Sequence, residues 1–207
     1  MTVGDDVRIS LDYWSNREWN GAVAHACDAV AETGRKRYPE LGEEAQFTRT
    51  LRDGIDIFAA LAAADIDFGS SRLPVAVASD LPEGRPDIAD VLYAVRRYLR
   101  GDTEAIPGGC DITPPVDTVP MIHIYLGHLR LRASAALGML AVAVLAPENR
   151  GETIPGSYNL GWRQHIFHLV GWWGWQDHFR EILTTGPVDC QELDFGPEWT
   201  HWEKVRG

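Results

Sequence analysis

The most apolar stretch of the chain runs from residue 133 to 146 and contains only one polar side chain. A segment that is apolar on every side predicts a helix buried in the middle of the protein. Asp117 and Pro120 are typical of a helix N-terminus, and Pro147 ends the apolar stretch. We therefore predict one buried central helix over about 118–146.

Apolar residues at helical spacing predict four further helices. They are expected at about 16–33, 41–64, 87–100 and 160–183. Gly54 lies inside the second of these and indicates either a weak point or a close contact. Alternating residues in 3–11, with the short apolar run 73–78, allow one small two-stranded element. The predicted fold class is all-α, with five principal helices around the central one.

Length and charge limit the classes of protein that this chain can be. Its 207 residues fit a single helical domain, and the acidic and aromatic tail 188–207 is expected to dock on the body. A formal net charge of −11 argues against nucleic acid and anionic membranes as partners. Arg130 and Arg132 interrupt the apolar stretch too early for a membrane span. Three widely spaced cysteines and the lack of a secretion signal at the N-terminus favour a cytoplasmic protein with free thiols.

Candidate chemistry begins in the first half of the predicted central helix. Placed at about 100° per residue, its polar residues form two stripes on roughly opposite sides. The first stripe contains His123 and Arg130, and the second contains Tyr125, His128 and Arg132. One stripe can reach solvent, and the other must face the interior, where each Arg needs a carboxylate or an anionic ligand.

The predicted helix 160–183 supplies the opposite wall of a pocket. His168, Trp172 and Trp175 lie at spacings of three and four, and His178 lies on a neighbouring face. An aromatic stripe of this kind fits either a core or a ligand cage. Because consecutive helices usually pack antiparallel, His178 is expected to be the histidine nearest to the central helix stripes.

These residues predict a small-molecule-binding protein, and an enzyme if a proton is transferred in the pocket. His128, His178 and Tyr125 are the candidate catalytic residues. The candidate ligand-binding residues, chosen for an aromatic or anionic molecule, are His123, Arg130, Arg132, His168, Trp172 and Trp175. The alternative is an acidic protein of the inhibitor or immunity type that binds a basic protein with its aromatic, acidic C-terminal region.

The sequence predicts neither a metal site nor an identified cofactor. His165 and His168 have a spacing that could share an ion, but no third ligand follows at the distance of a known zinc motif. His25 is expected to be an ordinary histidine on the helix 16–33. Searches for phosphate loops, dinucleotide glycine patterns and nucleophile elbows are negative.

Overall fold

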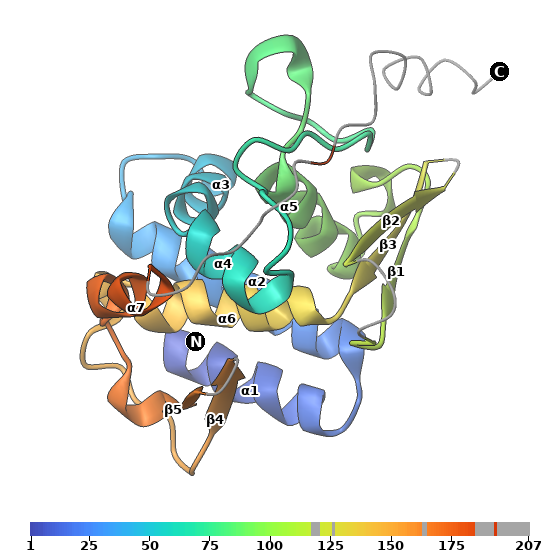
Figure 1. The fold of residues 1–207 in the computed structure, drawn as a ribbon. Coiled ribbons are helices and arrows are strands. Elements are labelled where there is room, and N and C mark those ends of the chain that lie inside the picture. Colours follow the sequence, from blue (N-terminus) through green and yellow to red (C-terminus); the bar gives the residue numbers. More distant parts are fainter. Residues whose placement is uncertain (117–120, 126, 163–164, 185–192, 194–207) are drawn as a thin grey trace, which may run out of the picture.

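The structure is a computed structural model that describes residues 1–116, 121–125, 127–162, 165–184 and 193 (Figure 1). In this part of the chain five helices come first, followed by three strands, one helix, two strands and a last helix. The helices are α1 (Val3–Ser15), α2 (Trp19–Arg37), α3 (Glu43–Asp53), α4 (Ile55–Ala62), α5 (Ile88–Leu99), α6 (Ser134–Leu145) and α7 (Gln176–Leu183). The strands are β1 (Cys110–Thr113), β2 (Ile122–Tyr125), β3 (His128–Arg132), β4 (Asn159–Trp162) and β5 (His165–His168), with short 3-10 turns, among them η4 (Leu169–Gly171), between elements.

Helix α6 is the centre of the fold, as its composition predicts. It crosses the middle of Figure 1 and packs against α1, α2 and α4. Leu140, Val142 and Leu145 are buried, whereas Leu137 is only partly buried. A helix without a polar side can be stable in water only when neighbours cover all of it, which is the arrangement found here.

Two glycines let α4 and α6 approach closely. A Cβ on Gly138 would lie 2.7 Å from the Phe58 carbonyl oxygen, and a Cβ on Gly54 would lie 3.0 Å from the Val142 side chain. Gly54 also separates α3 from α4, so the predicted helix 41–64 is two helices. The close contact and the break in the helix are both consequences of a residue without a side chain.

The all-α prediction is wrong, because residues 122–125 and 128–132 form strands rather than the first half of the central helix. Strand β3 is the middle strand of a three-stranded sheet of order β1-β3-β2, parallel to β1 and antiparallel to β2. The apolar residues here alternate with polar ones, which is the period of a strand. Gly127, at φ 77°, precedes β3 where the chain reverses from β2. The central helix begins only at Ser134.

The predicted helix 160–183 is also wrong. Strands β4 and β5 pair antiparallel, η4 follows, and among the described residues of this range the α-helix is confined to Gln176–Leu183. Gly174 adopts φ 77°, and its N–H donates to the Val144 carbonyl at 2.9 Å. That left-handed residue ends the preceding turn and starts α7 on the end of α6.

The N-terminal segment departs from prediction for a different reason. Residues 3–11 are not extended but belong to α1, whose N-terminus is capped reciprocally by Thr2 and Asp5. A capping box of this kind satisfies two free N–H groups and favours a helix over a strand. The run 73–78, its expected partner, has no regular structure in the described chain.

The structure describes only part of the residues on which two further predictions depend, the docked tail and the free thiols. The docked tail 188–207 lies outside them apart from Leu193, whose N–H donates to the Ser71 hydroxyl at 3.0 Å. Cys27 and Cys110 are free and buried, and Cys190 lies outside the described residues. In the described part of the chain, no helix combines the length and apolarity needed to cross a membrane.

Candidate functional site on the three-stranded sheet

Five of the predicted site residues share one face of the β1-β3-β2 sheet. Cys110, Leu129 and Leu131 point into the core and are nearly inaccessible to solvent. Side chains alternate between the two faces of a strand, so the residues between these positions point outward. The outward residues of β2 and β3 are His123, Tyr125, His128, Arg130 and Arg132.

The central row of this outer face crosses all three strands. Arg130 on β3 is paired in register with Asp111 on β1 and with His123 on β2. The Arg130 side chain is 60% exposed, and its Nε lies 4.0 Å from the Asp111 carboxylate. The guanidinium is therefore held loosely and keeps most of its donors directed at solvent.

His128 differs from Arg130, because both of its ring nitrogens have partners. Nδ1 lies 2.9 Å from the Gly108 carbonyl oxygen, and Nε2 lies 3.0 Å from the Asp111 carboxylate. Both partners are hydrogen-bond acceptors, so each ring nitrogen has a protein group within hydrogen-bond distance. His128 thus fixes the orientation of Asp111 and leaves no nitrogen free for a ligand or a proton transfer.

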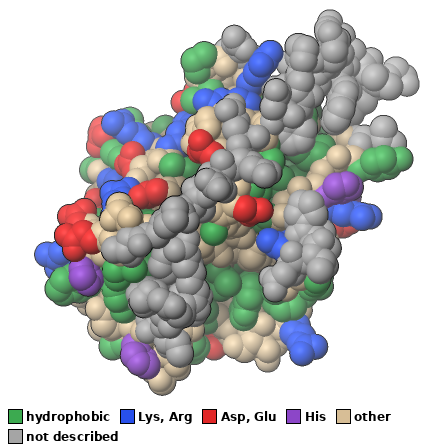
Figure 2. All heavy atoms as spheres, viewed as in Figure 1, with side chains coloured by type: hydrophobic (Ala, Val, Ile, Leu, Met, Phe, Trp, Pro, Cys, Tyr) green, Lys and Arg blue, Asp and Glu red, His purple; other side chains and the backbone are tan. Residues whose placement is uncertain are grey.

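Positive charge collects locally on this face although the chain as a whole is acidic. Arg130 and Arg132 lie there against one carboxylate of the described strands, Asp111. Arg132 is engaged by the Val116 carbonyl at 2.6 Å and by the Ser134 hydroxyl at 3.3 Å. Figure 2 shows His and Arg side chains gathered where the sheet lies in Figure 1.

An exposed aromatic ring borders the same face. Tyr125 is 66% exposed and is the in-register neighbour of His128. Its ring is therefore accessible to a ligand bound on this face. Neither buried thiol adds a nucleophile, since burial raises the pKa of Cys110 to about 12 and that of Cys27 further.

The other four predicted site residues lie elsewhere, around η4 and α7. Trp172 stacks on His178, with ring centroids 5.7 Å apart, and Trp175 meets the same imidazole edge-on at 6.2 Å. His168 is exposed at the end of β5, where its Nδ1 lies 2.6 Å from the Asn159 side-chain oxygen. Sheet β1-β3-β2 and α7 lie at opposite ends of α6 in Figure 1, so the two predicted groups do not share a site.

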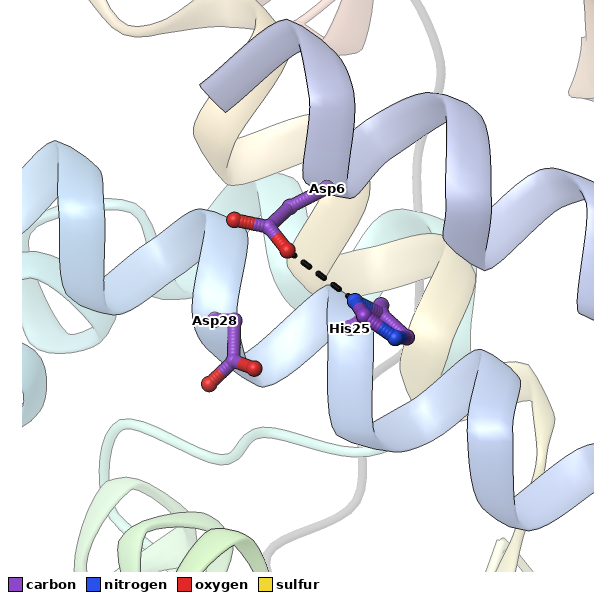
Figure 3. A group of neighbouring side chains, drawn as sticks. All are labelled: Asp6, His25 and Asp28. Atoms are coloured by element: carbon purple, nitrogen blue, oxygen red, sulfur yellow. Dashed lines mark hydrogen bonds and ion pairs between the residues drawn. The ribbon is translucent and has the colours of Figure 1, made fainter. Parts of the chain in front are cut away.

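A third group brings together residues that sequence analysis did not connect. Asp6 on α1 and His25 and Asp28 on α2 each offer a ligand atom, and these atoms lie within 4.8 Å of one another (Figure 3). His25 Nδ1 is 3.0 Å from Asp6 Oδ1. Burial raises the pKa of Asp6, and the hydrogen bond from His25 opposes that shift.

One part of this group is visible in the sequence. His25 and Asp28 are three residues apart, which places them on the same side of a helix. Asp6 gives no such signal, because it reaches them only through the packing of α1 on α2. Asp111 gives no local signal either, because it reaches His128 only through the pairing of β1 with β3.

Comparison with known proteins places the chain in a family. Residues 2–199 match the model of the Rv1289 family. The chain belongs to that family. It is 46% identical over 207 residues to the uncharacterized protein Rv1289 of Mycobacterium tuberculosis and to the uncharacterized protein Mb1320 of Mycobacterium bovis. Each alignment covers 99% of both chains. No solved structure matches.

Proposed function

We propose that the protein binds an anionic molecule on the outer face of the β1-β3-β2 sheet. The observation that carries this proposal is the Arg130 guanidinium, 60% exposed and 4.0 Å from its nearest carboxylate. A planar guanidinium with free donors binds carboxylate or phosphate groups in a bidentate manner. In this proposal Arg130 holds the anionic group.

The neighbours of Arg130 support the same function. His123 lies directly across the strand pair from Arg130, so its ring and the guanidinium can reach the same bound group. In this proposal His123 is a second hydrogen-bond donor to the anion. Tyr125, further along β2, offers its exposed ring to an aromatic part of the ligand.

Titration of the 15N-labelled chain with phenyl phosphate and with inorganic phosphate tests this proposal. Saturable shifts of the amide signals of Ile122–Tyr125 and His128–Arg132 are expected, at lower concentration for phenyl phosphate because Tyr125 contacts its ring. Arg130→Gln should weaken binding about tenfold or more. Arg97→Gln is the matched control, because Arg97 is an exposed arginine on α5 that pairs with Asp102. Equal binding by wild type and Arg130→Gln would refute the proposal.

A second candidate function is docking of a basic protein on the surface around η4 and α7. Val170 is 54% exposed and Trp175 is 53% exposed, beside the exposed carboxylates Asp177 and Glu181. An aromatic side chain rimmed by acidic groups favours a positively charged partner, since tryptophan is enriched at binding hot spots.

A cationic peptide of lysine and leucine tests the second candidate. It should shift the amide signals of α7 in the wild type, and Trp175→Ala should reduce that effect. Glu104→Gln, which removes one exposed carboxylate in the turn after α5, is the charge control. Shifts that are spread over the whole surface, or unchanged in Trp175→Ala, would exclude this surface.

Both proposals concern binding and assign no reaction. The free, buried thiols of Cys27 and Cys110 support our inference of a cytoplasmic location, where cysteines stay reduced.

A further inference from the structure

We propose that Asp6, His25 and Asp28 bind a divalent transition-metal ion between α1 and α2. The site is separate from the outer face of the sheet, and its argument does not depend on anion binding there. It rests on the distances within the group, on the atoms left without partners and on the local balance of charge.

The distances suit one shared ion. Two ligand atoms that are each about 2.1 Å from an ion and at right angles to each other lie about 3.0 Å apart. His25 Nδ1 and Asp6 Oδ1 are 3.0 Å apart, and the third ligand atom, from Asp28, lies within 4.8 Å of both. An ion can therefore replace the proton that now joins His25 to Asp6, with small movements of Asp28.

Each member of the group keeps atoms that have no protein partner. Within the described residues, the hydrogen bonds of Asp28 from Arg96 and Arg100 both end on Oδ1, which leaves Oδ2 free. Asp6 Oδ2 and His25 Nε2 likewise have no partner among the described residues. The figure of the site shows Asp6 and His25 pointing toward each other from the two helices, with Asp28 one turn along α2 from His25 (Figure 3).

The charge of Asp6 provides an independent reason to expect a cation. Asp6 is 3% exposed, and in the described part of the chain no Lys or Arg lies within ion-pair distance of it. A buried carboxylate is costly unless a cation or several hydrogen bonds compensate it, and His25 supplies one hydrogen bond. Asp28 is different, because Arg96 at 3.0 Å and Arg100 at 2.5 Å already balance it.

The donor set indicates the class of ion. One imidazole with two carboxylates suits Zn²⁺, Mn²⁺ or Co²⁺ better than Mg²⁺ or Ca²⁺, which prefer oxygen ligands alone. Three protein ligands leave at least one coordination position for water. His25 and Asp28 are partly exposed, with side chains 23% and 16% accessible, so that position can open toward solvent.

Titration of the chelator-treated full chain with Co²⁺, followed by competition with Zn²⁺, tests the site. Bound Co²⁺ is read from its visible absorption, which reports imidazole and carboxylate coordination, and native mass spectrometry counts the ions per chain. One ion per chain is expected. Asp6→Asn and His25→Gln should each weaken Co²⁺ binding by about tenfold or more. Asn and Gln keep polar side chains at both positions, and circular dichroism checks that these variants fold.

Matched variants separate this site from adventitious binding. Asp12→Asn removes a half-exposed carboxylate of the same helix α1, and His178→Gln removes an exposed histidine. Both should bind Co²⁺ as the wild type does. Arg100→Gln should bind Co²⁺ more tightly, by about threefold to tenfold, because it removes a positive charge next to Asp28. Binding that is unchanged in Asp6→Asn and His25→Gln, or no binding at one equivalent, would overturn the proposal.

Discussion

Two histidine–aspartate pairs in this protein have the same heavy-atom spacing and opposite surroundings. His25 and Asp6 meet at 3.0 Å between α1 and α2, where Asp6 is buried. His128 and Asp111 also meet at 3.0 Å, on the outer face of the sheet, where the Asp111 side chain is 59% exposed. Distance alone therefore does not distinguish them, and burial and the remaining partners do.

The difference lies in which side-chain atoms have no protein partner. The exposed pair is closed, because His128 uses its second nitrogen on the Gly108 carbonyl and water solvates Asp111. The buried pair is open, because the described residues leave one oxygen of Asp6 and one nitrogen of His25 without partners. An exposed pair costs little to form and can orient a neighbour such as Arg130, whereas an open buried pair favours an additional ligand.

The largest difference between the pairs should appear when the histidine is removed. His25→Leu leaves the buried Asp6 carboxylate without its hydrogen bond, and should lower the free energy of unfolding by about 2–4 kcal/mol. Urea denaturation measures this change. If His25→Leu loses less free energy of unfolding than His128→Leu, burial of Asp6 does not determine the cost of removing its histidine.

A smaller effect of opposite sign is expected for Asp6→Asn. Burial raises the pKa of Asp6 above its ordinary value of 3.8, so the folded chain holds this proton more tightly than the unfolded chain. The stability that the protonated group contributes is fully present below pH 3.8 and is lost as pH rises through the folded pKa.

The Asp6→Asn variant does not lose stability in this way as pH rises, because Asn stays uncharged and still accepts a hydrogen bond from His25. In metal-free buffer its stability should therefore gain on the wild type as pH rises from about 4 toward 7. Denaturation at a series of pH values measures the difference. A constant difference across this range would mean that Asp6 titrates alike in the folded and unfolded chains.

The smallest effect belongs to the exposed pair. His128→Leu should change the free energy of unfolding by less than about 1 kcal/mol, because water replaces its partners on the surface. The same variant should weaken anion binding, since it frees Asp111 to pair with Arg130. Urea denaturation and the phenyl phosphate titration check the two parts, and a loss of stability above about 2 kcal/mol would contradict the first.

The sequence predicts the helices of this fold better than its strands. Helix α5 lies within the predicted range 87–100, and Asp87 and Asp90 cap its N-terminus reciprocally. Residues 133–146 could only be a buried helix. The neighbouring segment 122–132 is so short that its apolar positions fit the period of a helix as well as that of a strand. Because the prediction joins this segment to the apolar helix, it overlooks the strand-like alternation of the apolar residues, which are Ile122, Ile124, Leu129 and Leu131.

The candidate sites were predictable only where their residues are neighbours along the chain. The five candidates on the sheet cluster within ten residues, and the prediction that they form two stripes on opposite sides of a helix is wrong. The sheet places all five on one face, namely His123, Tyr125, His128, Arg130 and Arg132. Asp6 and Asp111 join their histidines through tertiary packing, over 19 and 17 residues respectively. Local periodicity carries no information about such contacts.

Spectra of the histidine ring nitrogens in the 15N-labelled full chain test the contrast between the two regions most directly. The chain has seven histidines, and His25→Gln, His123→Gln and His128→Leu assign the three that the test reads. Addition of Zn²⁺ should shift the His25 nitrogens and leave those of His123 and His128 in place. Addition of phenyl phosphate should shift His123 and leave His25 unchanged. If both ligands shift the same histidines, or if Zn²⁺ leaves His25 unaffected, the assignment of a metal ion to the buried pair and an anion to the sheet is wrong.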